Sequence, residues 1–333
     1  MNTLATLRPT RVAGVTQREV FAEAVANLAS LDPRILMLDA EVGNSTRADL
    51  FEEAHPDRYL PMGIAEQNMV GVAAGLAAVG FVPFVTTFAV FVAKRALDQV
   101  RVLVAQPRLP VKIAVGYTGL CSGMAGKTHQ PVEDVTIMRA MPNMVVLDPV
   151  DNVEMRAMVR AAVDHPGPVY LRVYREVVPT LFEDGYRFRL GRAVTLREGR
   201  DVALISSGPQ SGRVLQAAEI LAARGVDAYV LHVPTIKPLD STSIVAAAVA
   251  TDFVVTVEEH SILGGLGGAV AEVLGERRPT LMRRIGLRDV FGESGPNDAL
   301  LEKYGLSPQR VADQVLAFLR ARARKEAGVV GNP

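Results

Sequence analysis

The chain has 333 residues, enough for about two domains of ordinary size. Its 36 Lys and Arg residues balance its 36 Asp and Glu residues, so no net charge attracts nucleic acid or anionic lipid. Apolar residues make up 49% of the chain, but no apolar run is long enough to span a bilayer or to serve as a secretory signal, and Cys121 is the single cysteine. We therefore expect a cytoplasmic protein with no nucleic-acid partner, no membrane partner and no internal disulfide.

The first half of the chain alternates short β-branched runs with longer amphipathic stretches. This pattern is typical of a parallel sheet that is covered by helices on both faces. It predicts strands over 34–40, 82–88, 111–117, 143–149 and 168–175, and helices over 16–30, 65–79, 90–105 and 151–164. Thr16 with Glu19 forms a capping-box pattern at the start of the first helix, and Asp151 suits an N-cap.

The second half repeats the alternation. It predicts strands over 201–208, 226–234, 252–259 and 280–287, and helices over 210–224, 241–250, 267–274 and 307–322. The stretch between the halves mixes Pro, Gly and charge, as a surface linker does. We therefore predict an α/β fold of two doubly wound, mostly parallel sheets: a first domain over 14–178, a linker over 179–190, a second domain over 191–325 and a tail over 326–333.

Open parallel sheets bind ligands at the carboxyl ends of their strands. After the third predicted strand comes a long, glycine-rich segment, "GYTGLCSGMAGKTHQPVED", which carries Lys127 and His129. Loops of this length in compact domains usually have a function, and an ordinary surface loop is the alternative interpretation. No HExxH pattern and no paired cysteines are present, so the sequence predicts no metal ligand in this chain.

The stretch "GIAEQNMVGVAAGLAAVG" places Glu66 at the start of a helix that is apolar on all sides. Such a helix is buried, and Gly71 and Gly75 allow another backbone to approach closely, as at a subunit interface. We therefore expect the Glu66 carboxylate to face a dry cavity. Desolvation would raise its pKa there, although the helix N-terminus opposes that shift.

Six segments resemble the C-terminal half of transketolase, and also the matching part of 1-deoxyxylulose-5-phosphate synthase. They are "GIAEQN", "TTFAVFVAKRALDQVR", "GKTHQPVED", "RAMPNMVVLDPVD", "KPLD" and "VVTVEEHSILGGLGGAVAE". The resemblance runs from about Thr16 to Phe318 and implies a pyrimidine-binding domain followed by a transketolase C-terminal domain. It implies a transferase of carbohydrate metabolism that moves a two-carbon ketol unit between sugar phosphates with thiamine diphosphate.

The family's diphosphate-binding signature, GDG followed by Asn, does not occur in this sequence. The resemblance therefore implies one subunit of a split transketolase, which shares thiamine diphosphate with an N-terminal-type partner. That partner would bind Mg²⁺. By analogy the assembly would be a heterotetramer of two of each chain, with self-association through the tetramer.

The resemblance also implies roles at the cofactor. Glu66 corresponds to the catalytic glutamate that hydrogen-bonds the aminopyrimidine ring of thiamine diphosphate. Phe88 and Phe91 correspond to aromatic residues that pack around the pyrimidine, although ordinary core packing would explain their spacing as well. Glu41 corresponds to an acidic residue near the cofactor.

At the substrate, His129 corresponds to a histidine that lines the channel and binds sugar hydroxyls or shuttles a proton. Arg175 corresponds to an arginine that clamps the substrate phosphate, and a planar guanidinium suits that task. Arg18 and Ser45 correspond to further phosphate contacts, although a solvated helix-face charge is an equal interpretation of Arg18. Lys127 would add positive charge.

Two positions depart from the family pattern. Tyr117 stands where a phosphate-binding histidine is usual, and Ala125 stands where an acidic residue usually contacts sugar hydroxyls. We therefore expect a sugar other than the xylulose and ribose phosphates. Two alternatives stay open: the beta subunit of a 2-oxoacid dehydrogenase, and a non-catalytic relative of the fold.

Overall fold

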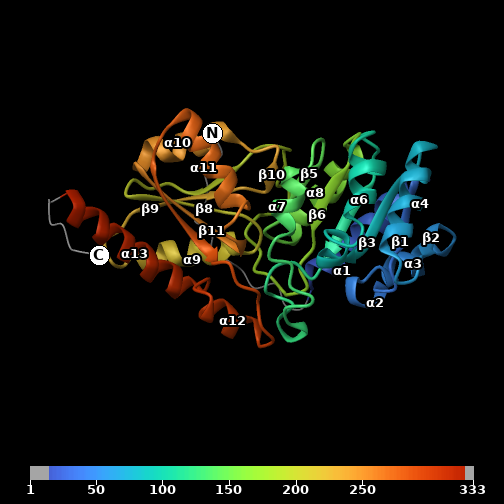
Figure 1. Cartoon of the computed structure of the whole chain (residues 1–333), viewed down its shortest axis with the longest axis horizontal. Helices are drawn as coiled ribbons and strands as arrows, with labels where there is room; N and C mark the ends of the chain where they lie inside the picture. The colour runs from blue at the N-terminus through green and yellow to red at the C-terminus, as the bar shows by residue number, and fades with distance from the viewer. Residues whose placement is uncertain (1–14, 327–333) are drawn as a thin grey trace.

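The computed structural model describes residues 15–326 as two sheets, each covered by helices, which lie side by side along the longest axis of the molecule (Figure 1). The first part contains α1 (Gln17–Ala29), β1 (Ile35–Asp39), α2 (Gly43–Thr46), α3 (Asp49–Ala54), η1 (Pro56–Arg58), β2 (Tyr59–Pro61), α4 (Glu66–Ala78), β3 (Val82–Phe88), α5 (Ala89–Val92), α6 (Leu97–Gln99), η2 (Val100–Ala105), β4 (Lys112–Gly116), η3 (Gly123–Ala125), α7 (Asp134–Ala140), β5 (Val145–Leu147), α8 (Asn152–Asp164) and β6 (Val169–Arg172). The second part contains β7 (Val194–Arg197), β8 (Val202–Ser206), α9 (Gln210–Ala222), β9 (Ala228–His232), β10 (Thr235–Lys237), α10 (Ser241–Thr251), β11 (Phe253–Ser261), α11 (Leu266–Arg277), β12 (Leu281–Leu287), α12 (Asn297–Lys303) and α13 (Pro308–Glu326).

The first sheet has the strand order β10-β5-β6-β4-β3-β1-β2. Every neighbouring pair is parallel except β10 with β5. The chain moves from β1 to one side to form β2, and then crosses back to form β3 and β4 on the other side. This reversal between β1 and β3 is a topological switch point, where open α/β sheets bind ligands.

The second sheet has the order β12-β11-β8-β9-β7, in which only β7 is antiparallel to its neighbour. Apolar side chains of α9 and α13 fill one face, and those of α10 and α11 fill the other. The first sheet is likewise covered by α1, α3 and α8 on one face and by α4, η2 and α7 on the other. The prediction of two doubly wound, mostly parallel α/β sheets is confirmed.

Strand β10 comes from the second part of the chain but completes the first sheet. Thr235 pairs with Leu147 and Lys237 with Val146 of β5, in antiparallel register. The Lys237 ammonium also donates hydrogen bonds to the carbonyls of Arg139, at 3.0 Å, and of Met141. The sheets are thus joined by main-chain pairing as well as by side-chain packing.

Local signals at the helix starts are confirmed. Glu19 accepts hydrogen bonds from the backbone N–H and the hydroxyl of Thr16, both at 2.7 Å, and Asp151 accepts one from the Glu154 N–H at 2.8 Å. The prediction of one helix over 90–105 is wrong. The chain forms α5, an irregular turn, α6 and the π-helical turn η2, and the irregular turn carries Arg95, which reaches Glu66. Among helices of residues 15–326, none has the length and apolarity needed to cross a membrane.

Candidate functional site

The carboxyl ends of β1, β3, β4 and β6 meet at one edge of the first sheet, because these strands are parallel neighbours. Ser45 lies in the segment after β1, Phe88 ends β3, Tyr117 follows β4 and Arg175 follows β6. Glu66 begins α4, after the carboxyl end of β2. Residues that are far apart in the sequence therefore gather at the switch point.

Phe88, Phe91, Tyr117 and His129 form what we call the ring cluster. The Phe88 ring centroid lies 4.0 Å from that of Tyr117, 5.7 Å from that of Phe91 and 5.5 Å from that of His129. His129 also lies 5.5 Å from Phe91, with its ring edge-on. Ala125 packs against the same cluster. The structure thus places the predicted pyrimidine-contacting aromatics directly beside the predicted substrate histidine.

Glu66 is buried, as expected, with 1% of its side chain exposed. It does not face an empty cavity, however, because Arg95 Nη1 donates to both carboxylate oxygens at 2.8 Å. The Arg95 side chain is 46% exposed, and its guanidinium lies 4.5 Å over the Phe91 ring. The Arg95 guanidinium thus occupies the position where the sequence predicts a dry cavity in front of the carboxylate. The signal for this partner was the cost of burying a carboxylate without a cation.

Two arginines, Arg175 and Arg18, lie near Tyr117 of the ring cluster. Arg175 Nη1 donates to the Tyr117 hydroxyl, and its guanidinium stacks 5.0 Å over that ring. Arg18 Nη1 donates to the Ser45 carbonyl at 2.8 Å, while its Nε is buried without a hydrogen bond. Burial, together with the charge of Arg175, lowers the pKa of Arg18. Two such close cations with a free N–H suit an anionic ligand.

Glu41 and Lys127 lie at the rim of this site. Both are exposed, and neither side chain makes a hydrogen bond within the described residues. Glu41 has a φ of 60° and Tyr117 a φ of 58°, a left-handed conformation that is uncommon for residues other than glycine. The two strained positions follow β1 and β4, and strain of this kind gathers at functional sites. The structure does not bring Glu41 or Lys127 into contact with the ring cluster.

Asp39, at the end of β1, was missed by the sequence analysis. It is buried, and it accepts hydrogen bonds from the Val42 N–H at 2.8 Å and from the Thr86 hydroxyl at 2.9 Å. Burial raises the pKa of Asp39. The side chain shapes the turn that leads to Ser45, and Val42 packs on the ring cluster. A carboxylate at the end of an otherwise apolar strand was the available signal.

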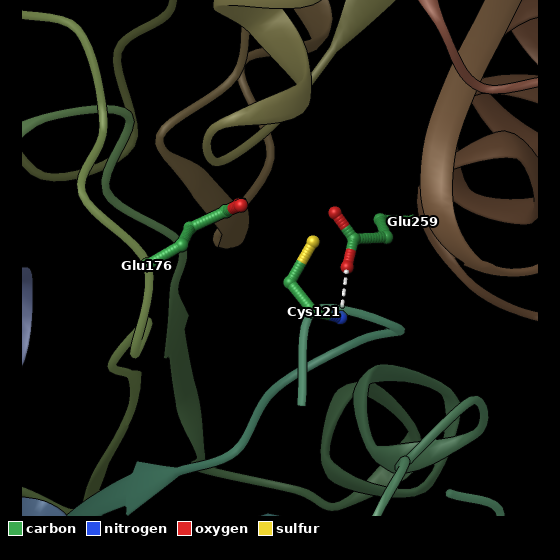
Figure 2. A group of neighbouring side chains, drawn as sticks. All are labelled: Cys121, Glu176 and Glu259. Atoms are coloured by element: carbon green, nitrogen blue, oxygen red, sulfur yellow. Dashed lines mark hydrogen bonds between the residues drawn. The ribbon is translucent and has the colours of Figure 1, made fainter. Parts of the chain in front are cut away.

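A group of two carboxylates and a thiol lies between the two domains. Cys121, Glu176 and Glu259 are close enough to ligate one metal ion (Figure 2). Arg213, however, donates to Glu176 at 2.6 Å and to Glu259 at 2.9 Å, so its guanidinium already balances both carboxylates. Burial raises the pKa of the Cys121 thiol, which disfavours the thiolate that a metal would need. We assign this group to the domain junction.

Comparison with known families adds two matches. Residues 13–180 match the model described as transketolase, pyrimidine binding domain. Residues 191–311 match the model described as transketolase, C-terminal domain. Both halves of the chain are therefore similar to consecutive parts of one enzyme family.

Three curated relatives match over most of their own length. A putative uncharacterized transketolase family protein of Sinorhizobium fredii is 44% identical over 91% of this chain and 89% of its own. A 6-deoxy-6-sulfo-D-fructose transketolase subunit of Clostridium sp. is 42% identical over 88% of this chain and 91% of its own. A putative transketolase C-terminal section of Methanocaldococcus jannaschii is 40% identical over 91% and 96%.

One solved structure is similar to this chain in both sequence and fold. It is described as a split gene transketolase in an inactive β4 tetramer, and it is 44% identical to this chain. The two agree with a TM-score of 0.86 over 92% of this chain and 99% of that one.

Proposed function

The chain belongs to the transketolase family, and from this premise we propose that it is the C-terminal-type subunit of a split, thiamine diphosphate-dependent transketolase. It would transfer a two-carbon ketol unit between sugar phosphates, together with a partner subunit that carries the diphosphate-binding domain. One observation carries this proposal: Glu66, the ring cluster and the Arg18–Arg175 pair converge on one sheet edge.

The residues fit the pyrimidine end of the cofactor. Glu66 is a buried carboxylate that can hydrogen-bond a ring nitrogen, and Phe88 and Phe91 offer apolar ring faces beside it. Arg95 is exposed enough to move towards solvent when a ligand takes its place at Glu66. When bound, thiamine diphosphate supplies the carbon nucleophile of the reaction. We assign its diphosphate and Mg²⁺ to the partner subunit, which is supported by the subunit names of the full-length relatives.

In this proposal the chain supplies proton balance and orientation. Glu66 holds a proton at the pyrimidine ring nitrogen, and the surrounding apolar helix α4 excludes water from that contact. His129 has its Nδ1 2.9 Å from the Thr128 hydroxyl, which leaves Nε2 for a sugar hydroxyl. Its contacts with Phe88 and Phe91 place this ring next to the cofactor position.

The far end of the substrate would lie at the two arginines. Arg175 and Arg18 would bind the phosphate, with the segment around Ser45 closing the site. The free Nε of Arg18 is a donor that an anion would satisfy. Lys127, which is exposed on the same loop as His129, would attract the anion at longer range. We propose that Glu41, which is also exposed, lies near the bound cofactor.

We also propose that the sugar differs from the usual donor. Ala125 packs on the apolar ring cluster, so no carboxylate reads a hydroxyl from that position. Tyr117 uses its hydroxyl to hold Arg175 instead of contacting the phosphate as a histidine would. A site that lacks a polar partner discriminates weakly for the corresponding hydroxyl. One relative is named for a sulfonated fructose, which supports testing anionic ketoses beyond the pentose phosphates.

The face of helix α4 supports association with a second chain. Val72 on α4, Ile64 just before it, and Val102 and Leu103 on the adjacent turn η2 are between 37% and 74% exposed. A Cβ at Gly75 would meet no atom within 4 Å, so this side of the helix is open to another backbone. We propose that this face is covered in a heterotetramer, and the similar structure is described as a tetramer.

The test is reconstitution with a candidate N-terminal-type subunit, thiamine diphosphate and Mg²⁺. We expect ketol transfer from an anionic ketose only when both chains are present, and a mass of two of each chain. The donor panel should contain xylulose 5-phosphate, fructose 6-phosphate and 6-deoxy-6-sulfofructose. A clear preference for xylulose 5-phosphate would contradict the altered-sugar proposal. Copurification of a lipoyl-bearing acyltransferase would favour a 2-oxoacid dehydrogenase, and an inactive complex that still assembles would favour a non-catalytic relative.

A further inference from the structure

Residues 118–133, which we call the site loop, connect β4 to α7 and carry His129. The loop belongs to the first domain, yet its internal backbone–backbone hydrogen bonds are short-range turns, such as His129 N–H to Gly126 carbonyl at 2.9 Å. Such turns do not fix the loop relative to the sheet. Most of the hydrogen bonds that connect it to the rest of the molecule come from the second domain, which otherwise provides none of the predicted site residues.

The start of the site loop is held by Glu259 of β11. Its Oε1 accepts hydrogen bonds from the N–H groups of Leu120, at 2.7 Å, and Cys121, at 3.0 Å. Figure 2 shows the second of these bonds, with Glu176 on the other side of the thiol. Arg213 fixes the other Glu259 oxygen at 2.9 Å. The carboxylate is buried and has little freedom to move.

The middle of the loop is held by Asn297, the first residue of α12. Asn297 Oδ1 accepts from the Gly123 N–H, and Asn297 Nδ2 donates to the Cys121 carbonyl, both at 3.1 Å. The Gly295 N–H donates to the Gly123 carbonyl at 3.1 Å. A Cβ at Gly123 would lie 2.2 Å from the Gly295 carbonyl oxygen, so this approach requires glycine.

The end of the loop is held by Gln130, which directly follows His129. Its buried side chain donates to the Leu120 carbonyl at 3.2 Å and to the Glu293 carbonyl of the second domain at 3.0 Å. The Ser122 hydroxyl donates to the His129 carbonyl itself at 3.3 Å. The His129 carbonyl and the residue that follows it are therefore both tied to segments that the second domain fixes.

We propose that Asn297 and Gln130 are positioning residues, through which the second domain holds His129 against Phe88 and Phe91. This inference rests on the proposed function, because it assigns His129 to the substrate. Asn297 also lines a cavity of about 300 Å³ together with Arg175, so the same side chain borders the phosphate end of the site. The second domain thus sets the distance between the histidine and the arginine.

The test uses the full reconstituted complex. Asn297→Leu removes both hydrogen bonds at similar volume, and Asn297→Asp keeps only the one from Gly123. We expect kcat to fall about 100-fold in Asn297→Leu, as small misplacements of catalytic groups do, with a smaller fall in Asn297→Asp. The KM for the sugar phosphate should change less than threefold, because Arg175 remains. Asp298→Leu, on the exposed next position of α12, is the matched control and should stay within twofold.

A second measurement does not depend on turnover. Hydrogen exchange of the site-loop amides should accelerate at least tenfold in Asn297→Leu while that of α1 stays unchanged. Unchanged exchange, or accelerated exchange with an unchanged kcat, would overturn the positioning role. If the wild-type complex transfers no ketol unit, the proposed function fails by itself. The imidazole resonance of His129, titrated with fructose 6-phosphate, then decides: a shift lost in Asn297→Leu supports the role, and no shift overturns it.

Discussion

Two buried groups of carboxylates and arginines differ in one respect, the exposure of the cation. At the sheet edge, Glu66 is buried but Arg95 is 46% exposed. At the domain junction, Arg172 is 2% exposed and donates to Asp134 at 3.2 Å and to Asp148 at 3.3 Å, both of which are also buried. The Tyr170 hydroxyl also donates to Asp134, and the Tyr174 and Ser207 hydroxyls donate to Asp148, while Asp134 Oδ1 has no hydrogen-bond partner within the described residues.

The difference separates a site from a structural element. An arginine at the surface can leave its carboxylate and be hydrated, so Glu66 can exchange its partner for a ligand. A cation enclosed on all sides cannot leave without breaking several hydrogen bonds, and the carboxylates would remain buried and unpaired. We therefore expect substitutions at the first group to change activity and those at the second to change stability.

The largest expected effect is on turnover. Glu66→Ala removes the group that holds the pyrimidine proton, and we expect kcat of the reconstituted complex to fall by up to about 10⁴-fold. The unfolding midpoint and the assembly mass should stay close to wild type, since Arg95 can turn to solvent. Glu23→Ala, an exposed carboxylate on α1, is the control. Retained turnover in Glu66→Ala would remove the basis of the catalytic assignment.

Substitution of Arg172, in the second group, should change stability and leave substrate binding largely unchanged. Arg172→Met keeps an unbranched apolar chain but leaves Asp134 and Asp148 without their cation. We expect the free energy of unfolding to fall by about 3–5 kcal/mol in urea titrations. The variant complex, where it folds, should keep the KM for the sugar phosphate. A stability equal to wild type would show that the junction tolerates an unpaired acidic pair.

Lys112 extends the comparison to a buried cation with carbonyl partners. Its Nζ donates to the carbonyls of His165 and Gly167, both at 2.7 Å, and burial lowers its pKa to about 7. Between pH 7 and pH 10 the unfolded chain keeps this proton while the folded chain releases it, so stability rises with pH. Relative to Lys112→Met, wild type should gain up to about 1.4 kcal/mol per pH unit in urea unfolding. Parallel curves of unfolding free energy against pH for wild type and Lys112→Met would contradict this expectation.

The smallest effect is expected at the phosphate end. Tyr117→Phe keeps the ring under the Arg175 guanidinium but removes the hydroxyl that accepts its hydrogen bond. We expect the KM for the sugar phosphate to rise about fivefold, or ~1 kcal/mol, with little change in kcat. An unchanged KM would mean that Arg175 is held in place by stacking alone.

Much of the fold could be predicted because its signals are local. Runs such as "RILMLDA" and "VPFVTTF" are β-branched and apolar throughout, as strands buried on both faces must be. The missed strands are short: β2 and β10 have three residues each and β7 has four, too few for a clear periodicity, and β10 also pairs with a strand far away in sequence. The sequence pattern holds no information about such a partner.

The site residues likewise divide into those that the sequence indicated and those that it did not. Glu66 was singled out because a charge beside an apolar helix conflicts with its surroundings, and Arg175 because its motif resembles that of the family's phosphate-binding arginine. Arg95 and Asn297 were missed because each acts through contacts across many residues, 29 between Arg95 and Glu66 and 174 between Asn297 and Gly123. The sequence between two such residues carries no propensity or periodicity that reveals their contact. Only the folded backbone brings them together.

Strand β10 has a consequence for how the molecule folds and divides. Because the second domain supplies the edge strand of the first sheet, neither domain keeps all its main-chain pairing alone. A chain cut in the linker would leave β5 as a bare edge, open to aggregation. We therefore expect the two domains to unfold together in a single transition, and not to act as modules that can be exchanged one at a time between relatives.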